Sequence, residues 1–135
     1  MSNDTLNGKI GQEPHYYGDY VFNRAALPNN ATVNSNEFTL NNTNGALKIR
    51  GYIDAELTLT SEQHLTLKLQ YKDSAGDWQD DATVLSSSNA TIGSVNLFEV
   101  MPVPSTLKRV FRLQMTADFD ASAVHLTAPI EYIPR

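Results

Sequence analysis

The 135-residue chain has no cysteine, which excludes a disulfide framework and a thiolate metal site. Its stability must therefore come from packing or from assembly with other chains, and assembly in a cytoplasm is expected. Long apolar runs are also missing, and residues 1–4 carry neither a basic start nor the beginning of an apolar stretch. We expect neither a membrane span nor a signal peptide. The length is that of one domain, and 41% hydrophobic residues are enough to form a core.

The chain is short of basic residues, with 10 lysines and arginines against 15 aspartates and glutamates and a formal net charge of −5. This balance repels phosphate backbones on average, so nucleic acid is not an expected partner. A helical period is absent as well, while asparagine, threonine and serine are abundant, as at 29–30, 34–36 and 41–44. These residues weaken helices and favour turns and exposed strand faces. The composition therefore predicts an all-β domain with many turns.

The stretch from Ser61 to Leu85 carries the clearest structural pattern. Its first half alternates apolar with polar residues, which is the period of a strand with one buried face. The apolar positions are Leu65, Leu67, Leu69 and Tyr71. Residues 72–77 supply the short polar side chains and the glycine of a chain reversal, and Trp78 begins the return. A β-hairpin is predicted here.

Other segments repeat this pattern. Strands are expected at residues 37–40, 46–53, 55–60, 95–100, 109–116 and 124–132, with a turn at 41–45, a loop at 86–89 and a turn at 118–120. Gly51 interrupts the apolar face of its strand, which predicts a bulge or a close approach of backbone. Pro102 and Pro104 end the strand before them, because proline cannot donate to a ladder. Short strands at even spacing predict a single-domain antiparallel β-sandwich, a jelly roll.

Residues 1–30 lack a sustained period and hold a cluster of aromatic residues. One interpretation is an extended N-terminal arm, ahead of a jelly-roll domain over residues 31–135, whose aromatic side chains dock on a partner. The other is that Tyr20, Phe22 and Leu27 form the first strand of the domain. The sequence is consistent with both, and the predicted domain boundary at residue 30 follows the first.

Catalytic chemistry has few candidates. His15, His64 and His125 lack the neighbours of a Ser-His-Asp set and the spacing of a helical zinc site, so we interpret them as arm or surface residues. Asp54 and Glu56 share one face of an extended segment, which is compatible with glycosidase chemistry, but solvated strand carboxylates explain them as well. The prediction is a protein that is not an enzyme, with no catalytic, cofactor-binding or metal-binding residue.

Aspartates and one tryptophan are further candidates. The aspartates of two turn regions could supply oxygen ligands to calcium, although turn formation explains them without a metal. They are Asp73, Asp77, Asp80 and Asp81 around the hairpin, and Asp118 and Asp120 further along. Trp78, the only tryptophan, is suited to stack on a sugar ring or to fill a core or an interface. We expect burial in a core or an interface.

The order of sequence features from residue 57 to residue 133 is similar to that of a known protein family. The polar hairpin is followed by a proline-containing connector and by a basic and aromatic strand from Lys108 to Met115. A closing strand then begins with the small residues 121–124. This order resembles the small jelly-roll cement, or decoration, proteins on the capsids of tailed bacteriophages.

The resemblance implies a non-enzymatic virion structural protein without a cofactor. Such a protein would be assembled in the host cytoplasm, bind the outer capsid surface as a homotrimer, and cement neighbouring subunits of the major capsid protein. Large aromatic side chains are the expected contact residues. They are Tyr16, Tyr17, Tyr20, Phe22 and Trp78. The alternative is a carbohydrate-binding jelly-roll module of a phage or bacterial surface protein, which would bind through Trp78.

Overall fold

The computed structural model describes residues 20–40, 46–93, 97–105 and 107–133. These residues contain strands and no helix, and therefore no helix that could span a membrane. All strand pairs are antiparallel, which confirms the predicted all-β fold class. The strands are β1 (Tyr20–Ala26), β2 (Asn29–Asn34), β3 (Phe38–Thr39), β4 (Ala46–Ile53), β5 (Leu57–Thr58), β6 (His64–Lys72), β7 (Trp78–Ser88), β8 (Thr91–Ile92), β9 (Phe98–Val100), β10 (Val110–Asp120) and β11 (His125–Ile133).

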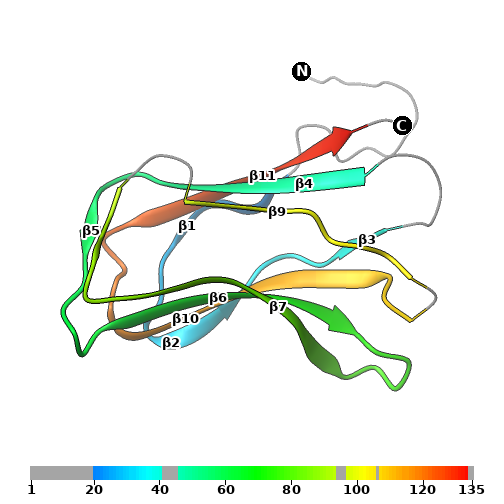
Figure 1. Ribbon diagram of the computed structural model, residues 1–135, viewed down its shortest axis with the longest axis horizontal. Helices are drawn as coiled ribbons and strands as arrows, with labels where there is room; N and C mark the ends of the chain where they lie inside the picture. The colour runs from blue at the N-terminus through cyan, green and yellow to red at the C-terminus, as the bar shows by residue number, and fades with distance from the viewer. Residues whose placement is uncertain (1–19, 41–45, 94–96, 106, 134–135) are drawn as a thin grey trace.

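Two sheets lie face to face and form a β-sandwich (Figure 1). One sheet has the strand order β1-β11-β4-β9, and the other has the order β2-β10-β6-β7 with β3 also paired to β10. A two-stranded ribbon of β5 and β8 lies at one end of the sandwich. The predicted antiparallel β-sandwich is confirmed.

The strand pairs are nested along the chain. β1 pairs with β11, β2 and β3 pair with β10, β4 with β9, β5 with β8, and β6 with β7. Two further pairs, β11 with β4 and β10 with β6, join these into the two sheets. The first and last strands consequently lie side by side, and the hairpin of β6 and β7 is the innermost pair.

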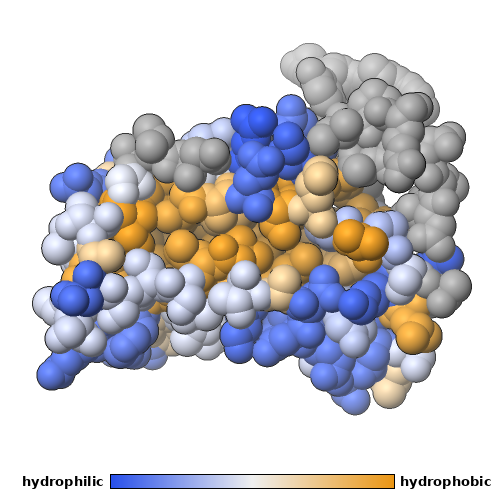
Figure 2. Space-filling view, viewed as in Figure 1, coloured by the Kyte–Doolittle hydropathy of each residue, from blue (hydrophilic) through white to orange (hydrophobic). Residues whose placement is uncertain are grey.

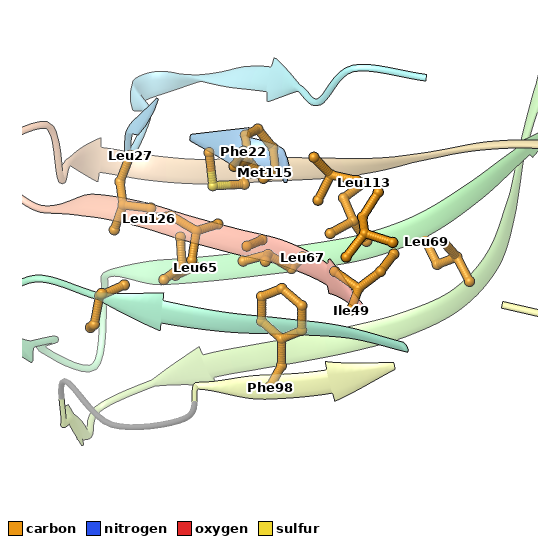
Figure 3. Close-up of a cluster of buried hydrophobic side chains, with 14 of the residues drawn as sticks. Phe22, Leu27, Ile49, Leu65, Leu67, Leu69, Phe98, Leu113, Met115 and Leu126 are labelled. Carbon is orange, nitrogen blue, oxygen red and sulfur yellow. The ribbon is translucent and has the colours of Figure 1, made fainter. Parts of the chain in front are cut away.

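The core fills the space between the two sheets. On the face that carries β7 and β9, apolar side chains are visible between the layers (Figure 2). Inside, Leu67 pairs with Met115 and Leu69 with Leu113, and all four side chains are buried. Ile49 meets them from the opposite sheet (Figure 3). Each such burial contributes roughly 2 kcal/mol to stability.

The predicted hairpin is confirmed, and so is its turn. β6 and β7 flank residues 73–77, where Gly76 has a φ of 89°, a value that glycine adopts without steric strain. The Asp73 carboxylate accepts the backbone N–H groups of Ala75 and Asp77 at 3.0 and 2.9 Å. Polar turn chemistry therefore explains this aspartate.

Two predicted connections are wrong, because strand pairing overrides their polar composition. Residues 86–88 belong to β7 and pair with the first residues of β6, rather than forming a loop. Residues 118–120 belong to β10, and the chain turns only after them. Serine and aspartate resemble loop residues in the sequence, but residues 86–88 pair with β6 and Asp120 pairs with Asn29 of β2. The predicted turn at 41–45 lies outside the described residues.

The predicted boundary between arm and domain, at residue 30, lies too far along the chain, because the first strand begins at Tyr20. Residues 20–26 form β1, which pairs with β11, and Val21, Phe22 and Leu27 are buried in the core. Two irregularities in the register let the adjacent residues Val21 and Phe22 both point inward, so β1 shows no alternation in the sequence. The alternative interpretation, a first strand near Tyr20, is confirmed. Residues 1–19 lie outside the described residues.

Gly51 marks a close approach and not a bulge. It lies opposite Phe98 in the pair of β4 and β9, and its carbonyl accepts the backbone N–H of Leu97 at 2.6 Å. A Cβ atom added to Gly51 would stand 2.0 Å from Cε2 of the Phe98 ring. The ring therefore covers the glycine backbone, and only glycine fits beneath it.

Candidate protein-contact surface

Two histidine–aspartate pairs tie neighbouring strands together. The Asp118 carboxylate accepts the backbone N–H of His64 at 2.7 Å and lies 2.7 Å from its ring Nδ1. The Asp54 carboxylate makes the same two contacts with His125, at 2.9 and 3.1 Å. β6 and β11 both begin at the end of the sandwich that carries β5 and β8 (Figure 1). Each pair thus joins the start of one strand to its neighbour in the sheet.

These contacts favour the ionised form of both carboxylates. The backbone N–H of His125 is the main cause of the lowered pKa of Asp54, and the backbone N–H of His64 has the same effect on the pKa of Asp118. A general acid in a glycosidase needs a raised pKa instead, so Asp54 is unsuited to that role. Its paired candidate, Glu56, is exposed. No serine or threonine hydroxyl among the described residues bonds to either histidine ring.

Acid will weaken this end of the sandwich. Because folding lowers the pKa of Asp54 and Asp118, both carboxylates stabilise the fold above the unfolded-chain pKa of about 3.9. That stability is lost as the pH falls through the lower pKa of the folded state. We expect the urea midpoint to fall below about pH 4 in the wild type, and less steeply in Asp118→Asn. The charge-matched control is Glu56→Gln, and equal flattening of the profile by both variants would contradict the role of Asp118.

The aspartates of the hairpin are also engaged. Asp80 accepts hydrogen bonds from Gln70 at 2.8 Å and from Lys68 at 3.1 Å, and Asp81 pairs with Lys108 at 2.7 Å. Within the described part of the chain, no group of three or more histidine, aspartate or glutamate side chains is placed to hold a metal ion. Structural hydrogen bonds therefore account for these carboxylates.

Trp78 lies half-buried on the outer face of the sheet and not in the core. The guanidinium carbon of Arg112 is 4.2 Å from the centroid of its ring, and Lys72 Nζ is 5.1 Å from it. Both distances are those of cation–π contacts. A sugar that stacked on the covered part of the ring would first have to displace a cation, which disfavours the carbohydrate-binding interpretation of this residue.

The described members of the predicted contact set, Tyr20, Phe22 and Trp78, do not lie together on one surface. Tyr16 and Tyr17 lie outside the described residues. Phe22 is 3% exposed, so its prediction as a contact residue is wrong: it is part of the core. Tyr20 is 42% exposed on β1, an edge strand far from β9, whereas Trp78 lies on β7, which runs beside β9.

The side of the sandwich between β7 and β9 carries an apolar surface that we call the open edge. β7 and β9 are edge strands of different sheets, and no ladder joins them. Figure 2 shows a continuous apolar band between the sheets on this face. Half-buried residues of these strands, Leu97 just before β9, and exposed residues of the connector after β9 form the open edge. They are Val84, Leu85, Leu97, Val100, Met101, Val103 and Leu107.

Of the large apolar side chains that the structure describes, the most exposed lie on the connector. Met101 is 51% exposed, Val103 70% and Leu107 69%. Sequence reasoning treated this stretch only as a link between strands. The signal was present, since Pro102 and Pro104 keep the segment out of a sheet, and apolar residues there have no neighbouring strand to cover them.

The rim of the open edge is fixed by Lys108. Its ammonium group pairs with Asp81 of β7 and lies 5.0 Å from the centroid of the Tyr71 ring. The hydrogen bond to Asp81 raises the pKa of Lys108. Register shifts on β7 after its contacts with Leu67 and Leu69 indicate two β-bulges, which interrupt the outer ladder. Bulged edges resist strand addition, so side chains are the better means of contact here.

Comparison of the chain with protein-family models, with curated proteins and with solved structures finds no match.

Proposed function

We propose that this chain is a non-enzymatic structural protein of a tailed-phage virion. It binds the outer capsid surface as a homotrimer, cements neighbouring subunits of the major capsid protein, and uses no cofactor. The observation that carries the proposal is the group of exposed apolar side chains that the connector contributes to the open edge. Clustered exposed apolar residues mark protein contacts more often than scattered ones do.

The strand order supports the same proposal. A jelly roll is a long hairpin rolled up into two facing sheets, so the nested antiparallel pairs support the proposal that this sandwich is a jelly roll. A jelly roll is also the fold of the decoration proteins that the sequence resembles. The histidine–aspartate pairs join neighbouring strands, so their hydrogen bonds have a structural role, as the proposal of a non-enzymatic protein requires.

Binding through the open edge combines two physical contributions. Burial of an exposed aliphatic side chain against a partner contributes roughly 1.5–3 kcal/mol. Three copies in one trimer then bind several capsid subunits at once, which raises the effective affinity without new contacts. Modest apolar surfaces on each copy are therefore sufficient for stable decoration.

Decoration is tested by sedimentation. Capsids of the encoding phage that lack this protein are mixed with the purified chain and pelleted, and the wild type is expected in the pellet. The double variant Val103→Ser, Leu107→Ser should bind roughly tenfold or more weakly, because two apolar contacts are lost. The control is Tyr20→Ser, which removes an exposed aromatic ring from the opposite edge.

The outcomes separate the alternatives. Loss of binding in Tyr20→Ser alone would move the contact to β1 and away from the open edge. Absence of the wild type from the pellet would overturn the capsid proposal. Glycan binding that disappears in Trp78→Ala would replace it by the carbohydrate-binding module. Sedimentation velocity of the free chain tests the homotrimer, and a monomer at all concentrations would contradict it.

A further inference from the structure

Arg112 is held in a fixed orientation on the outer face of the sandwich. It lies between the buried residues of β10, so its side chain points away from the core. Its Nε donates a hydrogen bond to Oε1 of Gln70 at 2.8 Å, and its guanidinium carbon lies 4.2 Å from the centroid of the Trp78 ring. The hydrogen bond to Gln70 holds one edge of the planar guanidinium, and the Trp78 ring covers one of its faces.

No carboxylate of the described residues is in contact with this cation. Among the described residues, Lys72 pairs with Glu37 at 3.6 Å and Lys68 with Asp80 at 3.1 Å, but no carboxylate forms an ion pair with Arg112. Its terminal N–H groups also have no hydrogen-bond partner in the described part of the chain. Partial burial lowers the pKa of Arg112, and the attraction of Glu37 offsets this only in part. The guanidinium is therefore partly desolvated, and no described carboxylate forms an ion pair with it.

We propose that Arg112, positioned by Gln70 and Trp78, is a binding site for a carboxylate side chain on a partner protein. The inference goes beyond the proposed function, because it names a separate surface and does not require a capsid. A guanidinium donates two parallel hydrogen bonds to a carboxylate, which makes this pair stronger than a neutral contact. Because the side chain is already ordered, binding loses little rotamer entropy.

The surrounding groups favour a protein over an acidic sugar. Gln70, Gln114 and Asn34 form a row of amides that bond to one another across the sheet, at 3.5 Å and 3.1 Å. These mutual bonds engage groups that would otherwise bind sugar hydroxyls. The Trp78 ring is in contact with two cations, which limits stacking. Tryptophan and arginine are also the residues that contribute most to protein–protein binding.

The single tryptophan reports on this site alone. Blocked tri-glutamate and tri-glutamine peptides are titrated into the full chain, and Trp78 fluorescence and the Arg112 Nε–H resonance are followed. Saturable changes are expected with tri-glutamate and none with tri-glutamine. Equal changes with both peptides would overturn the inference. Changes with oligoglucuronate but not with tri-glutamate would overturn it in favour of an acidic sugar.

Two variants test whether the paired N–H donors of the Arg112 guanidinium are needed for binding. Arg112→Lys keeps the charge but loses the planar donor pair, so tri-glutamate should bind about tenfold more weakly. Arg109→Lys is the matched control, since this exposed arginine precedes β10 and should leave binding unchanged. Wild-type affinity in Arg112→Lys would contradict the site. If that variant fails to fold, the peptide comparison on the wild type still decides, and no result depends on capsids.

Discussion

Replacing Gly51 with alanine is expected to destabilise the sandwich by about 3 kcal/mol. The added Cβ would stand 2.0 Å from Cε2 and 2.5 Å from Cδ2 and Cζ of the Phe98 ring. The ring cannot simply move aside, because Phe98 is 6% exposed and packed against the core (Figure 3). Relief requires β9 to shift on β4. Urea unfolding of the wild type and the variant measures the difference.

A double-mutant cycle isolates the cause. Phe98→Leu alone loses part of a buried side chain and should cost about 1–3 kcal/mol, within the range for core truncations. In that background, Gly51→Ala should cost much less than in the wild type, because the ring that it would meet is gone. The same cost in both backgrounds would show that backbone conformation, and not the ring, demands glycine.

The second large effect is expected at the start of the chain. Deleting residues 1–22 removes Tyr20 from β1 and takes Val21 and Phe22 out of the core. Loss of a buried phenylalanine alone costs about 3–5 kcal/mol, so this truncation should unfold far below the wild type or fail to fold. Deleting only residues 1–19 leaves β1 and its pairing with β11 in the chain, so this truncation should still fold and should melt well above the longer one. Thermal unfolding followed by circular dichroism compares the two.

Phe22→Ala in the full chain is the matched control for the longer deletion. It should reproduce most of the loss, and equal melting temperatures for both truncations would contradict the role of β1. The shorter deletion also tests the docking role predicted for Tyr16 and Tyr17 in a chain that keeps all of β1. Undiminished capsid binding by that protein would remove both tyrosines from the contact surface.

The sequence predicts elements where one face is buried along a regular strand. Leu65, Leu67 and Leu69 alternate because β6 is a regular strand: its pairing with β10 has no register shift, and the extra residues in its pairing with β7 are on β7. The hairpin is therefore visible in the sequence. β1 is not visible, because its bulges place Val21 and Phe22 inside in succession. Periodicity therefore detects regular strands and misses strands that bend around an edge.

The candidate surfaces depend on strand neighbours, which no local pattern reveals. His64 meets Asp118 only because β6 lies beside β10. Trp78 of β7 meets Arg112 of β10 because both strands flank β6. Sequence reasoning identified Trp78 as important but assigned it to a core or an interface, and it did not single out Arg112. The exposed residues of the connector could have been found, since prolines excluded that segment from both sheets.

The nested strand order also determines what assembly of the chain costs. Closing a loop loses entropy that grows with its length, by roughly 0.6 kcal/mol for each doubling. β1 and β11 are separated by almost the whole domain, whereas β6 and β7 are joined by a short turn. Once an inner pair has formed, the next pair outward closes only the residues added on either side of it. The fold can thus grow outward from its central hairpin without closing one long loop, although its outermost strands are nearly the full chain apart.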